Sequence, residues 1–258
     1  MTETKSIGKV LTEFTYEPSP VERGYTGQTL YVNVSDNTIN SKLVTDDMKE
    51  KFTGGRGFGL WLLWQGTKDD TQWDDPENEI VIASGPCGGI TQYPGSGKSL
   101  VVTISPLSDI PVDSNVGGHF GPLLKFAGWD GIEIQGKAKK DVIVVIDGPS
   151  GRITIEEAPD APVDTHRLGQ WVIDELAETD EDKFYMSTVS AGTGSENTRM
   201  GCLNFSLYDR RRGAPRFKQA GRGGIGTVLR DKRIKALVVR SHPVKGDSNS
   251  PADPGRIA

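Results

Sequence analysis

Residues 117–138 read GGHFGPLLKFAGWDGIEIQGKA and join two different periodicities within one short stretch. The first part, 117–127, starts at glycines and then places apolar residues at helical spacing, which predicts a helix. The second part, 131–135, alternates like a strand that packs on a core. A glycine-rich loop, a short helix and a strand therefore follow one another directly at this point of the chain.

Outward from this stretch, periodicity predicts strands and helices over most of the chain. Glycine clusters followed by apolar runs recur at Gly54, Gly85 and Gly221. No repeat of fixed period exists, so the recurrence is compatible with a weak internal duplication without establishing it. The expected strands are 28–34, a hairpin partner ending at Leu43, 79–84, 99–105, 142–147, 152–156, 185–189 and 236–240; the other expected helices are one capped at 45–47 and ending at Phe52, then 60–64, 167–177 and 228–234.

The two ends of the chain differ from its middle. Residues 1–26 are polar and lack a sustained period, which predicts an N-terminal arm. Residues 27–241 carry the regular elements and are expected to form one domain. Residues 242–258 are rich in Pro, Gly and Ser and contain no closing element, which predicts a tail or linker. We therefore expect a second domain that is missing here or belongs to a separate chain.

Composition narrows the class of protein. The chain has 258 residues, of which 35% are hydrophobic, and this is enough to bury a core without disulfides or metal. The net charge of -5 argues against nucleic-acid binding, which favours a basic surface. Two cysteines without a CxxC pair and three histidines argue against a metal site made wholly within the chain. Because no signal sequence and no membrane-length apolar stretch is present, we expect a cytoplasmic protein without membrane insertion.

Two fragments resemble nucleotide-binding motifs, and both fail on context. PGSGKS (94–99) ends like a P-loop, but Gln92 stands where the first glycine belongs, and a strand-like run follows instead of a helix. GRGGIG (221–226) matches GxGxxG, but the preceding RRGAPRFKQA is basic and irregular rather than a buried strand. No acidic residue follows at the distance that a ribose hydroxyl requires. The sequence therefore predicts neither a P-loop nor a nicotinamide site.

Four glycine-rich loops share one chemistry. Each combines close backbone approach with a neighbouring cation or hydrogen-bond donor, which suits phosphate oxygens. For any single loop, tight turns and close helix packing are the better explanation. Four loops of one kind jointly favour a phosphate-bearing ligand. The loops are 54–57 with Arg56, 95–98 with Lys98, 117–119 with His119, and 221–224 with Arg222.

Several other residues carry weaker hypotheses. Cys87 lies in a glycine-rich loop between strands, where it could approach a metal centre, but a lone buried thiol is the commoner case. Cys202 is interpreted as structural. Trp61 and Trp64 are interpreted as core or interface residues. A basic cluster is usual for a solvated face, and directly ahead of AGRGG it is also placed to neutralise a polyanionic cofactor or to dock an acidic partner. This cluster consists of Arg210, Arg211, Arg212, Arg216 and Lys218.

The order of the motifs is more specific than any one of them. Five segments together resemble the N-terminal domain of the aldehyde:ferredoxin oxidoreductase family: GGRGFG (54–59), ENEIVIASGPCGG (77–89), GSGKSLVVTISP (95–106), residues 117–138, and AGRGGIGTVLRDKRIKALVV (220–239). The resemblance implies an α+β fold of two β-sheets with flanking helices. It also implies tungsten, or molybdenum, held by two molybdopterin-type dithiolene cofactors whose phosphates are bridged by Mg²⁺.

The resemblance implies roles for individual residues. Lys98 stands where the family has a phosphate-contacting arginine, which keeps the charge but loses the bidentate fork. Asn115, and Gln219 through its backbone carbonyl, fall where the family supplies oxygen ligands to the magnesium ion. Lys218 falls where a basic residue contacts phosphate. The whole expected cofactor-binding set is Arg56, Gly95, Gly97, Lys98, Asn115, Gly117, Gly118, His119, Lys218, Gln219, Ala220, Gly221, Arg222 and Gly223, with Asn115 and Gln219 as metal ligands.

The chain also lacks part of what the family carries. The family binds a [4Fe-4S] cluster and places its acid–base residues in C-terminal domains, and no CxxCxxxC occurs here. We therefore expect no catalytic residue in this chain, a cluster-bearing polypeptide or C-terminal half as partner, and a ferredoxin-like electron carrier. The leading hypothesis is the cofactor-binding part of an oxidoreductase that interconverts aldehydes and carboxylates and is inactive alone. The alternatives are a benzoyl-CoA-reductase-like tungsten subunit and a non-catalytic cofactor carrier or assembly protein.

Overall fold

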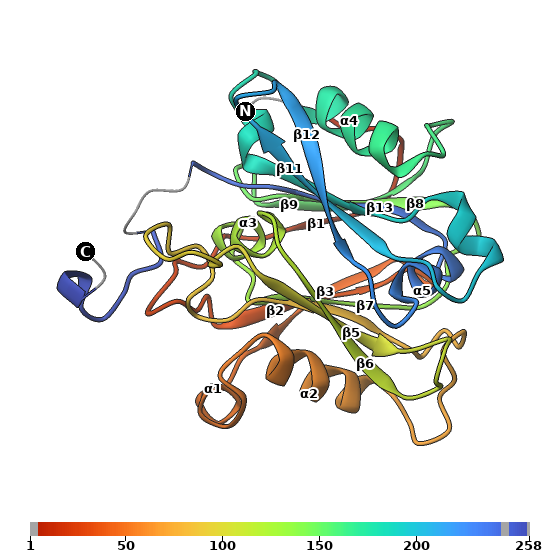
Figure 1. Cartoon of the computed structure of the whole chain (residues 1–258), viewed down its shortest axis with the longest axis horizontal. Helices are drawn as coiled ribbons and strands as arrows, with labels where there is room; N and C mark the ends of the chain where they lie inside the picture. The colour runs from red at the N-terminus through yellow and green to blue at the C-terminus, as the bar shows by residue number, and fades with distance from the viewer. Residues whose placement is uncertain (1–4, 244–247, 257–258) are drawn as a thin grey trace.

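Two β-sheets packed face to face form the centre of the molecule (Figure 1). The computed structural model describes residues 5–243 and 248–256. One sheet has six strands in the order β3-β2-β7-β4-β5-β6, and the other has seven in the order β1-β9-β8-β13-β10-β11-β12. With helices on both outer faces, this is the α+β fold that the sequence predicted.

The strands of the six-stranded sheet are β2 (Gln28–Asn33), β3 (Thr38–Leu43), β4 (Ile80–Ala83), β5 (Ser99–Ile104), β6 (Pro111–Val116) and β7 (Gly131–Gln135). Those of the seven-stranded sheet are β1 (Lys9–Thr15), β8 (Val142–Asp147), β9 (Arg152–Glu157), β10 (Met186–Ser190), β11 (Leu203–Asp209), β12 (Ala214–Ala220) and β13 (Ile234–Arg240). The helices are α1 (Asp46–Phe52), α2 (Arg56–Gly66), α3 (Phe120–Phe126), α4 (Thr165–Leu176) and α5 (Ile225–Asp231), with 3-10 turns η1 (Asp182–Tyr185), η2 (Thr193–Asn197) and η3 (Pro254–Arg256). No helix in the described part of the chain is long and apolar enough to cross a membrane.

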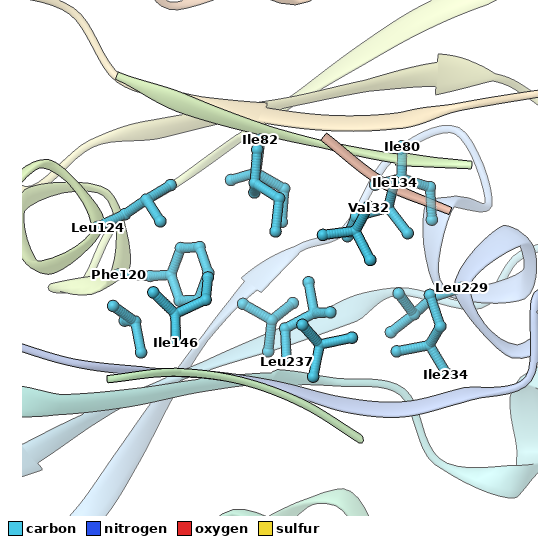
Figure 2. Packing of buried hydrophobic residues seen from close by; sticks show 14 of the residues in the cluster. Val32, Ile80, Ile82, Phe120, Leu124, Ile134, Ile146, Leu229, Ile234 and Leu237 are labelled. Carbon is cyan, nitrogen blue, oxygen red and sulfur yellow. The ribbon is translucent and has the colours of Figure 1, made fainter. Parts of the chain in front are cut away.

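Strand alternation lets one strand serve two cores. Ile80 and Ile82 of β4 point into the layer between the sheets, where Figure 2 shows them above Leu237 of β13. Val81, on the opposite face of the same strand, packs against α2 at Phe58. Because successive side chains of a strand point to opposite faces, a short, fully buried strand such as β4 contributes to both cores.

The helices form two outer layers and part of the central one (Figure 1). α1 and α2 cover the outer face of the six-stranded sheet, and α4 covers that of the seven-stranded sheet. The apolar faces of α3 and α5 belong to the core between the sheets, where Phe120, Leu124 and Leu229 lie beside the strand residues (Figure 2). The glycine-rich loops that lead into α3 and α5 are therefore held at the edges of this central layer.

The chain passes through one topology twice. The first half runs through hairpin β2–β3, helices α1 and α2, meander β4–β5–β6, helix α3 and strand β7, which returns parallel to β2. The second half runs through hairpin β8–β9, helix α4, meander β10–β11–β12, helix α5 and strand β13, which returns parallel to β8. The strand orders correspond one to one once β1 is set aside. This topology supports the internal duplication and makes the loop before α3 equivalent to the loop before α5.

The expectations for the two ends are wrong where the structure describes them. Residues of the supposed arm form β1, which pairs antiparallel with β9 at the edge of the larger sheet. Only every second side chain of β1 is half-buried, so the sequence carries a weak pattern. Near the other end, Asn249 is only 2% exposed, and its carbonyl oxygen accepts a hydrogen bond from the Gly24 N–H at 2.9 Å. Part of the supposed tail is therefore packed on the domain.

The basic segment ahead of AGRGG is also not irregular. Its residues form β12, an edge strand that pairs antiparallel with β11, and α5 begins at Ile225 rather than at the expected 228. β6 and β11 were likewise not expected. β12 runs antiparallel to β13, because each of the pairs β12–β11, β11–β10 and β10–β13 is antiparallel. The GxGxxG segment therefore does not lie in a parallel βαβ unit, which is the context a dinucleotide site needs.

The structure shows how deeply the two tryptophans and the two cysteines discussed above are buried. Trp61 is a half-buried residue of α2 that packs against the core beneath this helix and stacks on Phe52 with 5.1 Å between ring centroids. Trp64 is 73% exposed. Cys87 is exposed, so its interpretation as a buried thiol is wrong, and Cys202 is half-buried.

Candidate functional site

A pocket of about 680 Å³ opens where loops of the two halves meet. Its walls come from the loop between β4 and β5, the loop from β6 into α3, the β11–β12 hairpin and the turn η1. The predicted site residues that line it are Gly95, Gly97, Lys98, Gly117, Gly118, His119 and Lys218. The structure therefore brings two of the four glycine-rich loops together with a lysine from the other half.

The pocket carries uncompensated positive charge. Lys98 and Lys218 are exposed, and no carboxylate in the described residues forms an ion pair with either ammonium group. His119 also lines the pocket, and desolvation lowers its pKa because it makes the charged form unfavourable. With Arg210, which also lines the pocket, the site therefore combines three cations with a mainly neutral imidazole, a combination that attracts anions and donates hydrogen bonds.

Backbone packing alone explains some of the pocket glycines. A Cβ on Gly97 would lie 2.2 Å from the carbonyl oxygen of Gly118, so these two loops touch backbone to backbone. Gly118 itself has a φ of +117°, and Gly95 one of +87°, both in the region that favours glycine. These three glycines are required by the fold whether or not a ligand binds.

Gly117 and Gly221 have no such explanation. Neither has a positive φ, a Cβ on Gly221 would meet nothing within 4 Å, and one on Gly117 would meet only Lys218 Cγ at 3.9 Å. Both follow directly on the last residue of an edge strand, β6 or β12, and both precede the equivalent helices α3 and α5. A glycine that the fold does not need, repeated at equivalent positions, is what close approach of a ligand to the backbone requires.

The two glycine loops adjoin because β6 and β12 are in contact. Gly117 lies beside Lys218, and the N–H of Arg222 donates to Ser114 Oγ at 3.2 Å. Each loop therefore touches the opposite edge strand, one at Lys218 and the other at Ser114, which stand at matching positions two residues before the ends of β12 and β6. Asn115 and Gln219 stand at matching positions, each exposed and one residue before the end of its strand. The predicted metal ligands are therefore a related pair at the junction of the halves.

Other predicted residues lie outside the pocket. Arg56 forms an ion pair with Asp113 of β6 at 2.9 Å. Gly223, with a φ of +71°, would place a Cβ only 2.5 Å from Val112 Cγ2, so packing requires it. The remaining ones, Asn115, Gln219, Ala220, Gly221 and Arg222, belong to the β6–β12 junction and do not line the pocket.

The pocket also has an aromatic wall, which the sequence did not predict. Phe184 and Tyr208 meet edge to face with 5.1 Å between centroids, and the guanidinium of Arg210 lies 4.0 Å from the centre of the Phe184 ring. All three line the pocket. Arg210 had been noted as part of a basic cluster, but nothing local in the sequence links it to Phe184, which belongs to η1.

Lys125 fixes the first pocket loop from beneath. This residue of α3 is only 1% exposed, and its ammonium group donates to the carbonyl oxygens of Gly85 at 2.9 Å, Pro86 at 3.2 Å and Gly88 at 2.8 Å. Burial lowers its pKa to about 8. The three backbone acceptors belong to the loop that continues to Gly89 and Lys98 in the pocket wall.

The sequence of residues 29–241 matches the family model described as aldehyde ferredoxin oxidoreductase, N-terminal domain. The chain belongs to this family. The matched range contains both halves of the duplication and the pocket of this aldehyde ferredoxin oxidoreductase domain. It leaves out β1 and the segment around Asn249.

Known relatives agree with the assignment. The chain is 35% identical over 220 residues to the tungsten-containing aldehyde ferredoxin oxidoreductase of Pyrococcus horikoshii, covering 85% of this chain and 34% of that protein. It is 30% identical over 228 residues to the WOR-like subunit of an aliphatic sulfonate oxidoreductase from Pyrococcus furiosus, covering 84% and 34%. The chain thus spans about a third of the length of these curated relatives.

A solved structure is similar as well. The active-site complex BamBC of benzoyl coenzyme A reductase, determined with 1,5-dienoyl-CoA, superposes with a TM-score of 0.71 at 26% identity. The superposition covers 84% of this chain and 31% of that one. In the described parts of the present chain, no three His, Cys, Asp or Glu side chains come together to hold a metal ion.

Proposed function

We propose that this chain is the cofactor-cradling part of a tungsten or molybdenum oxidoreductase that interconverts aldehydes and carboxylates, with two molybdopterin cofactors held at the duplicated glycine loops. The observation that carries the proposal is the pair Gly117 and Gly221. Neither glycine is needed by the fold, and the two occupy equivalent positions in the halves. A pair of like sites fits a pair of like cofactors.

The residues present fit the phosphate groups of such cofactors. Lys98 and Lys218 supply positive charge without a carboxylate partner in the described chain, and the glycine loops allow backbone N–H groups to approach phosphate oxygens. Asn115 and Gln219, related by the duplication, offer the hard oxygen ligands that Mg²⁺ prefers between two phosphates. Arg56, paired with Asp113, contributes less than the sequence suggested.

When bound, the metal–dithiolene centre supplies the two-electron oxidation and reduction. The chain's own residues have other tasks. Lys98 and Lys218 neutralise phosphate charge, neutral His119 offers a hydrogen bond at the pocket wall, and Lys125 keeps the loop from Gly85 to Lys98 in place. None of these side chains is proposed to transfer a proton to substrate.

We propose that the rest of the oxidoreductase, on the same or another polypeptide, carries the [4Fe-4S] cluster and the substrate pocket. The chain spans only about a third of its relatives' length and contains no CxxCxxxC motif. Electrons would leave through that cluster to a ferredoxin-like carrier in the cytoplasm. The chain alone is then expected to bind cofactor without turning over substrate.

The charge of Lys98 provides a direct test. In the natural complex, Lys98→Glu places a carboxylate against phosphate and is expected to lower pterin content at least about tenfold. Lys51→Glu is a matched control, because Lys51 is an exposed lysine on α1 outside the pocket. Equal pterin content in wild type and Lys98→Glu would remove Lys98 from the site.

The similarity to the benzoyl coenzyme A reductase complex favours a second candidate, an aromatic thioester reductase subunit built on the same cradle. Assays of the complex with aldehydes and with aromatic acyl-CoA thioesters separate the two. Turnover of aldehydes supports the first candidate and reduction of the thioester supports the second. Bound pterin without either activity would instead indicate a carrier or assembly protein.

A further inference from the structure

Helices α3 and α5 each carry a buried cation at the same position. Lys125 and Arg230 both stand one residue before the last residue of their helix, and their exposed fractions are 1% and 7%. The two helices are equivalent in the duplication, and each follows one of the glycine loops of the proposed cofactor sites. Because a cation is rarely buried unless it is paired, the partners of each one show which part of the chain it holds in place.

The ion-pair partners of Arg230 are two carboxylates, whereas Lys125 binds three backbone carbonyl oxygens and one amide oxygen. Nε and Nη2 of Arg230 both donate to Glu196 Oε1, at 3.0 and 2.6 Å. Nη2 also donates to the two carboxylate oxygens of Asp141, at 3.2 and 3.0 Å, and Nη1 donates to the Ile234 carbonyl oxygen at 3.3 Å. The guanidinium group therefore joins Asp141, directly before β8, to Glu196 in η2.

Glu196 belongs to the loop that supports the second glycine segment. This loop, residues 191–202, joins β10 to β11 and corresponds to the loop after β4 in the first half. It touches segment 221–226 backbone to backbone, because a Cβ on Gly224 would lie 2.1 Å from the Arg199 carbonyl oxygen. The position of the glycine segment therefore depends on the loop that Arg230 reaches through Glu196.

The side chain of Thr227 fastens the same loop at its far end. Its Oγ1 donates to the Thr198 carbonyl oxygen at 2.7 Å and accepts from the Gly201 N–H at 3.1 Å. In the first half, Gly97 and Gly118 make the corresponding backbone contact between loops. Each half thus has a loop that packs on a glycine segment and a buried cation that holds this loop.

A second pocket leaves the beginning of the loop without packing on one side. The pocket measures about 480 Å³, and its walls include Trp73, Ser195, Glu196, Thr227 and Arg230. The side chain of Glu196 is 44% exposed there. On this side the ion pair with Arg230, rather than surrounding side chains, holds η2.

We propose that Arg230 is a positioning residue for the second cofactor. Through Glu196 it holds loop 191–202 against the glycine segment before α5, as Lys125 holds the loop after β4 in the first half. The pair with Asp141 attaches the same guanidinium group to the link between β7 and β8 and does not touch the loop. The inference rests on the proposed function, because the glycine segment has a ligand to position only if a cofactor lies there.

Amide hydrogen exchange of the full 258-residue chain tests the hold on the loop. Glu196→Gln keeps the shape of the side chain but removes its charge, so exchange across residues 191–202 is expected to rise at least about tenfold. Exchange across residues 85–98, which Lys125 holds, should stay at the wild-type rate. Unchanged exchange across residues 191–202 in Glu196→Gln would overturn the inference.

Asp141→Asn is the matched control, because it removes the other carboxylate of the same guanidinium group, which lies at 3.0 Å. In the natural complex, Glu196→Gln is expected to lower pterin content at least about twofold, since one of the two cradles loses its support. Asp141→Asn should change neither pterin content nor the exchange of residues 191–202. A role in stability alone would give both variants the same result, so equal pterin content in the two would contradict a positioning role.

A double variant tests whether Arg230 acts through Glu196. Arg230→Gln combined with Glu196→Gln should lose no more pterin than the more affected single variant, because the two residues form one unit. Losses that multiply would show that they act independently and would refute the inference. Circular dichroism verifies that each variant is folded. If the wild-type complex itself contained neither pterin nor metal, the proposed function would fail, while the exchange experiment would still decide whether the Arg230–Glu196 pair holds the loop.

Discussion

The ammonium nitrogen of Lys125 lies 3.2 Å from the side-chain oxygen of Asn249. Asn249 in turn donates to the carbonyl of Pro86 at 2.5 Å, one of the carbonyls that Lys125 itself holds. Helix α3, the loop after β4 and the C-terminal segment are thus joined at a single buried cation. The pocket wall from Gly89 to Lys98 begins at this junction.

Replacing Lys125 by an uncharged residue is expected to make the pocket wall from Gly89 to Lys98 more mobile. Lys125→Met keeps the length of the side chain but leaves several buried acceptors without a donor, so we expect a loss of roughly 2–3 kcal/mol in the free energy of unfolding. Amide hydrogen exchange should rise in the loop after Gly85. Denaturant titration and exchange mass spectrometry measure the two effects.

Lys139→Met is the control for Lys125→Met, because Lys139 is exposed. It should change neither stability nor exchange. If Lys125→Met left the exchange of residues 85–98 at the wild-type rate, the role of Lys125 in holding the pocket wall would be refuted.

Gly117 and Gly221, which the fold itself does not require to be glycine, give a second prediction. Gly117→Ala and Gly221→Ala should alter the free energy of unfolding by less than about 1 kcal/mol, since both sites have room and ordinary backbone conformations. They should nonetheless lower pterin content in the complex, because the added methyl group occupies the space that a phosphate would approach.

Two further glycine-to-alanine variants serve as comparisons for Gly117→Ala and Gly221→Ala. Gly223→Ala should cost about 1–3 kcal/mol through its clash with Val112 and its positive φ. Gly194→Ala, at an open site in η2, should change neither stability nor pterin content. Normal pterin content in Gly117→Ala and Gly221→Ala would contradict ligand contact at these loops.

The burial of Glu79 predicts that the stability of the fold depends on pH. Its carboxyl group is fully buried, neither oxygen has a hydrogen-bond partner within the described structure, and burial together with the nearby carboxylate of Glu133 raises its pKa from 4.5 to about 8. The folded state keeps this proton while the unfolded chain releases it. The contribution of Glu79 to stability is therefore fully present below pH 4.5 and is lost as the pH rises to about 8.

Glu79→Gln should remove this dependence. At pH 9 the variant is expected to be more stable than the wild type by roughly 1–3 kcal/mol, with a smaller or reversed difference at pH 4. Glu77→Gln, at an exposed neighbouring carboxylate, is the control. Urea unfolding across this pH range gives the result, and parallel profiles for wild type and Glu79→Gln would show that Glu79 is ionised in the folded protein at neutral pH.

Replacing Arg56 is predicted to have only a small effect on stability and on pterin content. Its ion pair with Asp113 is largely exposed, so Arg56→Ala should cost less than about 1 kcal/mol. Because the guanidinium of Arg56 is already paired with Asp113, pterin content should stay close to that of the wild type. A loss as large as that of Lys98→Glu would return Arg56 to the cofactor shell.

Much of the fold was predictable because its central strands have strong local patterns. β4 and β8 are continuous apolar runs, and the glycine loop, α3 and β7 follow directly from residues 117–135. β1 and β12 were missed because an edge strand buries only one side and carries charged residues on the other. In β12 the basic residues that disguise the strand include Lys218, which lines the pocket.

The candidate site could be predicted only in part. Local motifs identify the glycine loops and Lys98, since phosphate contact depends on short segments of backbone. The arrangement of Phe184, Tyr208 and Arg210 depends on the packing of η1 against the β11–β12 hairpin, which no short segment records. The difference between Gly117, which the fold does not require, and Gly97, which it does, likewise needs the coordinates of neighbouring loops.

The most direct test of the central claim is the ratio of tungsten or molybdenum and of pterin to this chain in the complex purified under anaerobic conditions. Because the duplicated loops provide two equivalent sites, we predict one metal ion and two pterins for each copy of the chain. A complex that contains the chain in full amount but neither pterin nor either metal would contradict the account.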